Sequence, residues 1–274
     1  MDESDDALDR ANRELVGVSP IAAEMTTPKR EERDPPNWIR PTFPAPSGLA
    51  EQTLAPETLA RLRLGTITGI GPRTMTALLE RFETAVAVLK ADSSELAMVP
   101  GLGAKTIEQI RLETRSDSID EIVQWCRTHN TQLLVREQAG YPAAMNDLED
   151  APALLYCRGE IVASDEMAVA IVGTRHATRY GLRQAERIAH SLARAGVTVI
   201  SGLARGIDAA AHEGALAGGG RTIAVLGGGL AQMYPPEHEG LAAAIAADGA
   251  VISEHPPMIK PRSGHFPQRN RIIA

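Results

Sequence analysis

Apolar residues in the second half of the chain gather in short runs of strand length, which are QLLV, ALLYCRG, MAVAIVG, VTVIS, RTIAVLGGG and GAVISE. Helical stretches rich in alanine lie between the later runs: LRQAERIAHSLARAG, GIDAAAHEGALAGG and PPEHEGLAAAIAADG. Alternation of strand and helix is typical of a parallel, doubly wound sheet. The runs are also nearly all apolar, as strands covered on both faces should be. The pattern therefore predicts an α/β fold with a mostly parallel, doubly wound sheet for residues 116–274.

A different pattern precedes the sheet, over residues 53–115. LAPETLARLRL has apolar residues at helical spacing and predicts a helix from Pro56. Two similar units follow, ITGIGPRTMTALLERF (67–82) and MVPGLGAKTIEQIRL (98–112), each with a Gly-x-Gly turn ahead of a helix. Two such units so close together resemble a pair of helix-hairpin-helix motifs, which predicts a small all-α, SAM-like domain.

The turn of the second unit has the features of a phosphate site. Gly101 and Gly103 leave turn amides at the start of a helix, and Lys105 adds a positive charge nearby. Such turns also serve only to pack one helix against its neighbour. Both interpretations stay open. If the turn binds phosphate, these three residues are the predicted secondary phosphate contacts.

Composition indicates which part of the chain folds, which partners suit its charge and which compartment it occupies. Residues 1–52 mix charge, proline and small residues without apolar periodicity, so we expect a disordered extension there. The chain has 28 Lys and Arg against 35 Asp and Glu, a formal charge of −7, so a polyanion must be met by a local basic patch. Cys126 and Cys157 fall in no metal-binding spacing and are expected to be free thiols. With no secretory signal and no apolar run of membrane-spanning length, we expect a soluble, cytoplasmic protein without membrane contact.

The loops after the predicted strands are where a parallel sheet binds ligands. They are GTRHATRYG, SGLARGID, LGGGLAQMYPPEH and SEHPPMIKPRSGHFPQRNR. A dinucleotide fingerprint needs closely spaced glycines after the first strand and an acid at the end of the second. Here Gly173 is followed by Thr174 and Arg175, and VTVIS ends in Ser201 and Gly202. Both halves of the fingerprint fail, so we expect no nicotinamide or flavin cofactor.

These loops instead offer arginine, lysine and small residues. Glycines allow a close backbone approach, exposed amides donate, and a guanidinium binds phosphate with two hydrogen bonds. Asp208 is expected to close the first turn of the helix that follows SGLARG. Residues 259–274 contain no acid and four basic residues: Lys260, Arg262, Arg269 and Arg271. Of these, Lys260 and Arg262 are predicted as secondary phosphate contacts. Arginines on three loops at one sheet edge indicate an extended polyanion rather than a single nucleotide.

Catalytic signals are weaker. No nucleophile, base and orienting acid fall in a recognisable spacing, and no metal-ligand cluster appears. His212 follows Asp208 by one helical turn, where helix packing is the expected role, and Glu254 is expected to orient the basic segment. The sequence therefore predicts a binding protein, not an enzyme, without a metal or other cofactor.

The ordered motifs AIVGTRHATRYG, SGLARGIDAAAHEGAL, TIAVLGGGLAQMYP, GAVISEHPP and FPQRNRIIA resemble the DprA/Smf family of DNA-processing proteins, over residues 132–274. The resemblance implies an extended Rossmann-like fold that binds single-stranded DNA as a homodimer. It also implies protection of incoming DNA and loading of the RecA recombinase onto it during natural transformation, with no established catalytic activity. The family pattern continues through a further helix and strand beyond Ala274, so we expect a C-terminally truncated member.

The resemblance also assigns DNA-binding residues, motif by motif. The expected phosphate contacts come from three motifs, and they are Gly173, Thr174 and Arg175, then Ser201, Gly202 and Arg205, and then Arg269, Asn270 and Arg271. Phe266 is expected to stack on a base or to pack against these loops. The alternative is a nucleotide-processing enzyme on a related Rossmann scaffold, similar to a phosphoribohydrolase. That family carries a Pro-Gly-Gly-x-Gly-Thr signature, which GGGLAQMYPPEH does not supply.

Overall fold

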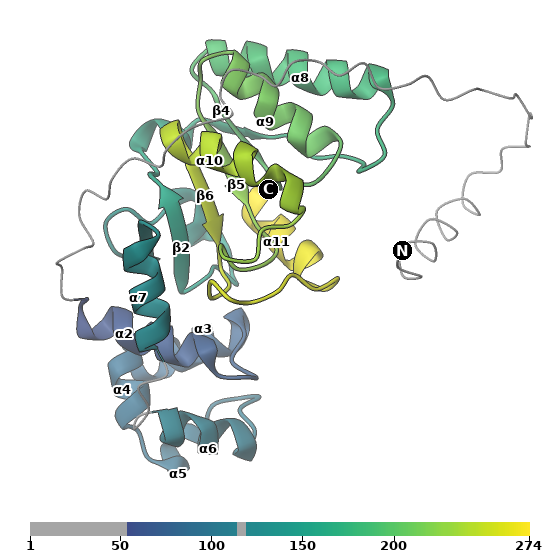
Figure 1. Cartoon of the computed structure of the whole chain (residues 1–274). Coiled ribbons are helices and arrows are strands. Elements are labelled where there is room, and N and C mark those ends of the chain that lie inside the picture. The colour runs from purple at the N-terminus through teal and green to yellow at the C-terminus, as the bar shows by residue number, and fades with distance from the viewer. Residues whose placement is uncertain (1–53, 114–118) are drawn as a thin grey trace, which may run out of the picture. The chain divides into compact units, whose positions relative to one another are not determined.

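The computed structural model describes residues 54–113 and 119–274, and the predicted disordered extension of residues 1–52 lies outside them. Helices fill the first described part (Figure 1): α2 (Pro56–Thr66), α3 (Pro72–Phe82), α4 (Ala85–Lys90), α5 (Ser93–Leu96) and α6 (Ala104–Glu113). The α3 and α6 helices each start directly after a Gly-x-Gly turn, as the two hairpin units predict.

Local chemistry explains where these helices begin. Pro56 and Pro72 occupy the first turns of α2 and α3. A backbone N–H has no partner within the helix there, so the N–H that proline lacks is not missed. Thr84 caps α4 by accepting from the amide of Ala87 at 3.1 Å. Asp92 and Glu95 form a reciprocal capping box at α5. Proline and cap residues therefore fix the starts of these four helices.

The second described part contains six strands and the helices that cover them. Its strands are β1 (Thr131–Val135), β2 (Leu154–Gly159), β3 (Ala168–Ala170), β4 (Thr198–Ser201), β5 (Thr222–Val225) and β6 (Ala250–Ser253). Its α-helices are α7 (Asp120–Thr128), α8 (Arg179–Arg194), α9 (Ile207–Ala217), α10 (Glu239–Asp248) and α11 (His265–Ile273). Short 3-10 turns form η1 (Ala143–Asp147), η2 (Ala163–Glu166) and η3 (Pro236–His238).

The six strands form one sheet in the order β1-β2-β6-β5-β4-β3. The four strands β3 to β6 run parallel, which confirms the predicted doubly wound part. The first two strands differ, since β1 pairs with β2 and β2 pairs with β6 in antiparallel register. Only η1 lies between β1 and β2, and only η2 between β2 and β3. Parallel neighbours need a long crossover, usually a helix, so the short connection through η1 joins antiparallel neighbours, and β1 and β2 form the antiparallel part of the predicted mostly parallel sheet.

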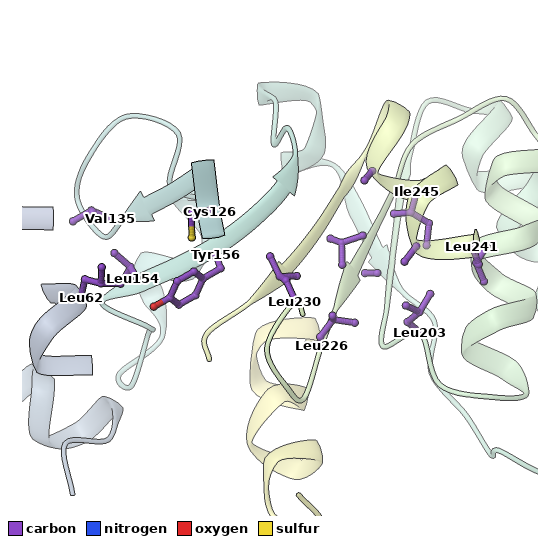
Figure 2. Close-up of a cluster of buried hydrophobic side chains, with 14 of the residues drawn as sticks. Leu62, Cys126, Val135, Leu154, Tyr156, Leu203, Leu226, Leu230, Leu241 and Ile245 are labelled. Carbon is purple, nitrogen blue, oxygen red and sulfur yellow. The ribbon is translucent and has the colours of Figure 1, made fainter. Parts of the chain in front are cut away.

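Side chains alternate between the two faces of the sheet. Along β6, Val251 joins one apolar cluster, whereas Ala250 and Ile252 join another. The first cluster packs against α7 and α10 through Cys126 and Ile245 (Figure 2). The second is covered by α11 through Ile272 and Ile273 and by the segment around η1. Helices on both faces explain why the central strands read as continuous apolar runs.

Strand β3 does not share this full burial. Val169 in the middle of β3 is 41% exposed, and Met167 and Val172 beside it are exposed further. β3 lies at one edge of the sheet, where one side has no neighbouring strand among the described residues. The expectation of complete cover on both faces therefore fails at this edge.

Within residues 54–113 and 119–274, no helix has both the length and the apolar composition that crossing a membrane requires. Cys126 and Cys157 are buried and unpaired, as predicted. Burial raises the pKa of each thiol to about 12, so both stay protonated near neutral pH.

His212 on α9 is a titratable side chain in the core. It is fully buried, and its Nδ1 lies 2.7 Å from Oγ1 of Thr222. That hydroxyl donates to the carbonyl oxygen of Val199 at 2.7 Å, so it accepts from His212 and fixes the proton on Nδ1. Burial lowers the pKa of His212 to about 3. The ring therefore packs as a neutral core side chain, which agrees with the packing role expected from the sequence.

His212 makes stability depend on pH. The unfolded chain binds a proton at His212 below its ordinary pKa of about 6.5, whereas the folded chain does not until about pH 3. The contribution of His212 to the free energy of unfolding is therefore fully present above about pH 7. It falls as the pH drops, by about 2 kcal/mol between about pH 7 and about pH 5. Urea unfolding across this range should show the loss, and His212→Gln should remove that share of it. Equal pH dependence in the two proteins would contradict a neutral, buried His212.

Candidate nucleic-acid interface

Two loops at the carboxyl edge of the sheet are joined by hydrogen bonds. The carboxylate of Asp208 accepts from the amide of Gly173 at 3.3 Å and from the amide of Gly202 at 3.1 Å. Ser201 Oγ donates to the carbonyl oxygen of Ile171 at 2.6 Å. Asp208 was expected only to close the first turn of α9, but it connects the loops after β3 and β4. These two loops therefore act as one support.

Glycine is required where these loops touch. Gly206 has a φ of 82°, and a side chain there would place its Cβ 2.3 Å from the carbonyl oxygen of Thr174. Gly202 lies so close to the side chain of Arg269 that an added Cβ would be 2.4 Å from the guanidinium nitrogens. The space left by these glycines is therefore occupied by a backbone carbonyl and a guanidinium of the protein itself, although the glycines were predicted to let a phosphate come close.

Arg269 of α11 is buried beneath these loops. It is 5% exposed, and its Nη1 donates to the carbonyl oxygens of Gly202, at 2.6 Å, and Val225. Burial lowers the pKa of this guanidinium, while the charge of Asp208 opposes that shift. The structure therefore places Arg269 as a support for the ends of β4 and β5, with one side facing the pocket described next.

A pocket opens at the place where four segments meet. Its lining comes from the loops after β3, β4 and β5 and from α11, and consists of Arg175, Gly202, Ala204, Arg205, Gly227, Tyr234, Pro235, Phe266 and Arg269. Five of these residues belong to the set predicted from sequence: Arg175, Gly202, Arg205, Phe266 and Arg269. No acidic residue belongs to this described lining, so the pocket is suited to an anion.

Each exposed arginine of the pocket lies over an aromatic ring. The Arg175 guanidinium is 4.9 Å from the centroid of the Phe266 ring, and that of Arg205 is 5.8 Å from the centroid of the Tyr234 ring. The two rings are 6.0 Å apart and tilted by 54°. Positive charge and aromatic rings therefore lie together in this pocket, the combination found at sites that bind single-stranded nucleic acids.

The sequence reasoning missed Tyr234 and its neighbour Glu237. Glu237 on η3 binds Arg205 with an Oε1 to Nε distance of 2.6 Å. Both residues belong to LGGGLAQMYPPEH, a loop already placed at the carboxyl edge of the sheet. An aromatic and an acid on that loop were a usable signal, because side chains there converge on residues from other loops.

The glycines of the third loop serve packing. An added Cβ would be 3.0 Å from the Phe266 ring at Gly227, 2.9 Å from Pro261 at Gly228 and 2.1 Å from the carbonyl oxygen of Pro256 at Gly229. These three glycines bring the segment 256–266 against the end of β5. They explain a cluster that had no assigned role in the sequence.

The other predicted residues lie outside the pocket lining. Gly173 packs against Ile207, Thr174 is exposed beside Arg175, and Ser201 is buried. Two residues of α11 also lie outside the lining: Asn270 is exposed, and Arg271 binds Glu254 at 2.5 Å and Asp150 at 3.3 Å. Glu254 thus holds the basic segment in place, as expected. The sequence motif around Arg269 therefore separates into structural and pocket-facing positions.

The predicted secondary contacts are exposed and lie outside the pocket lining. Lys260 and Arg262 lie exposed on the segment that leads into α11. Gly101, Gly103 and Lys105 are exposed at the second hairpin turn and the start of α6, and line no part of the pocket. Within the described residues, no group of three His, Cys, Asp or Glu side chains is placed to hold a metal ion.

A glycine pair tests the joined loops. Gly206→Ala forces an L side chain into a conformation it rarely adopts and against the carbonyl of Thr174, so the free energy of unfolding should fall by about 2 kcal/mol or more. Gly264→Ala is the matched control, because nothing lies within 4 Å of the added Cβ and φ is −67°. Denaturant unfolding measures both. Equal stability in the two variants would contradict the close loop contact.

Comparisons with known proteins find sequence relatives and a similar solved structure. The chain is 38% identical to protein Smf of Synechocystis over 212 residues, which cover 76% of this chain and 53% of the relative. It is 34% identical to DNA processing protein DprA of Bacillus subtilis, over 68% of this chain and 65% of the relative. The X-ray structure of DNA processing protein A from Streptococcus pneumoniae matches with a TM-score of 0.64 and 27% identity, over 81% of this chain and 75% of that one. The chain thus spans less than two thirds of either curated relative.

Two family descriptions divide the chain between them. The SAM-like helix-hairpin-helix tandem matches residues 49–116. The family described as DNA recombination-mediator protein A matches residues 132–274, which contain the whole pocket. Together with the relatives, this match shows that the chain belongs to the DNA recombination-mediator protein A family, also named DprA or Smf.

Proposed function

We propose that this protein binds single-stranded DNA at the carboxyl edge of its sheet, without reading base sequence. One observation carries the proposal: Arg175 and Arg205 line one pocket with the rings of Phe266 and Tyr234. Guanidinium groups bind backbone phosphates, and aromatic faces stack on bases of any kind. A single strand presents phosphates and open base faces together, whereas a duplex hides its base faces in the stack.

An extended strand suits the surface better than a nucleotide does. The pocket is bordered by the segment that carries Lys260 and Arg262, both exposed and without a carboxylate partner among the described residues. Further phosphates of a strand that is held at Arg175 would reach these cations. A single nucleotide has no groups that would use them.

The wider role follows from the family. The Bacillus subtilis and Streptococcus pneumoniae proteins carry the name DNA processing protein, and the family is described as a recombination mediator. We propose that the protein protects incoming DNA and loads the RecA recombinase onto it during natural transformation, acting in the cytoplasm as a homodimer. The hairpin turn at Gly101, Gly103 and Lys105 is proposed as a secondary phosphate contact.

Binding rather than turnover is the proposed activity. The described lining contains three arginines and a tyrosine but no histidine, aspartate or glutamate, the side chains most often used as general bases. The alternative, a phosphoribohydrolase-like enzyme, predicts release of free base from nucleoside monophosphates. We expect no such release when the whole protein is incubated with them.

The arginines of the pocket give the direct test. Arg175→Ala and Arg205→Ala should each weaken binding of an oligothymidine of about 20 nucleotides, by about tenfold for Arg175 at low salt. Each should also reduce the slope of log affinity against log salt by about 0.7, the value for one phosphate contact on a single strand. Fluorescence anisotropy across a salt series measures both quantities.

Arg194→Ala is the matched control, because it removes one exposed arginine from the last turn of α8, away from the pocket. It should change neither affinity nor slope appreciably. If all three variants bound alike, the proposed DNA surface would be wrong. Absence of oligothymidine binding by the unaltered protein would overturn the proposed function itself.

A further inference from the structure

The ion pair between Arg205 and Glu237 has no role in the proposed binding, although it lies at the pocket. Its two side chains are 49% and 52% exposed, and the Nε to Oε1 distance is 2.6 Å. Arg205 is the one arginine of the lining that forms an ion pair with a carboxylate among the described residues. Its charge is therefore offset before any ligand arrives, whereas that of Arg175 is not.

Both members of the pair are fixed by their own backbones. The Arg205 loop is held to the neighbouring loop at Gly206, which packs against the carbonyl of Thr174. Glu237 is presented by η3, and the Nδ1 of the next residue, His238, is 2.9 Å from the carbonyl oxygen of Leu203. The contact joins two anchored loops, and so differs from a chance meeting of two mobile side chains.

A carboxylate in this place has two opposing effects on a phosphate. It orients the guanidinium, because its Oε1 accepts from Nε of Arg205 and fixes the direction in which the Nη groups point. It also repels a phosphate that approaches the same guanidinium. Orientation of a half-exposed arginine contributes little, because exposed ion pairs are weak. The repulsion acts on every phosphate that Arg205 binds, so repulsion should dominate.

We propose that Glu237 is an internal counter-ion of Arg205 that limits how tightly the pocket holds a DNA strand. The inference rests on the proposed binding of single-stranded DNA. A phosphate either replaces the Glu237 carboxylate at Arg205 or binds the guanidinium beside that carboxylate, against its charge. In both cases Glu237 weakens the hold, chiefly by speeding dissociation of the strand.

The test is Glu237→Gln, measured on the full chain with an oligothymidine of about 20 nucleotides. Glutamine keeps an oxygen that accepts from Nε of Arg205 and removes only the charge. Glu237→Gln should tighten binding by about threefold at low salt, with slower dissociation in stopped-flow displacement. In an Arg205→Ala background, the same substitution should lose this effect.

Glu186→Gln is the control, because Glu186 is exposed on α8 and outside the pocket lining. It makes the same change in net charge. If Glu237→Gln bound like Glu186→Gln, or bound more weakly than the unaltered protein, the counter-ion role would be overturned. The proposed function would survive that result, since it fails only if the unaltered protein does not bind the oligonucleotide.

Discussion

A buried guanidinium holds the candidate interface together. Arg269 reaches from α11 to the carbonyl oxygen of Gly202, which follows β4, and to that of Val225, the last residue of β5. Burial raises the pKa of Asp208 and lowers that of Arg269, and the charge of each opposes the shift of the other. Burying either charge without an opposite partner would cost several kcal/mol, roughly 3–5. The two side chains therefore depend on each other, and four segments depend on both.

This arrangement divides the arginines into two kinds. Arg269 and Arg271 use their donors and charges within the protein, on backbone carbonyls in one case and on Glu254 and Asp150 in the other. Arg175 and Arg205 lie at the surface of the pocket, on loops whose positions the buried residues fix. Charge that is already placed by a rigid support loses less entropy when a ligand binds. The buried side chains thus fix the positions of the loops that carry the two exposed arginines.

Much of this was predictable from the sequence, because the signals were local. Gly-x-Gly turns ahead of α3 and α6, apolar runs for the strands, and the position of the loops at one sheet edge are all set by short-range patterns. The direction of β1 and β2 was not, since an apolar run is the same in either direction. Nor was the difference between Arg175 and Arg269, because exposure depends on contacts with residues distant in the chain.

The same reasoning explains the missed and misread residues. Tyr234 faces Phe266 only because β5 and α11 meet in space, although 32 positions separate residue 234 from residue 266. Gly227, Gly228 and Gly229 were unexplained until the segment 256–266 was seen to pack on them. Glycine was correctly expected wherever a backbone is approached closely. The sequence left open whether the approaching group is a phosphate or another part of the chain.

The central claim is that a single strand is bound by the loops at the carboxyl edge of the sheet. Hydrogen–deuterium exchange of the full chain, with and without a saturating oligothymidine of about 20 nucleotides, tests it most directly. The account predicts slower exchange in three segments, 173–176, 202–206 and 227–235, with the strands beneath unchanged. Protection confined to the hairpin turns at 69–72 and 101–104 would contradict it.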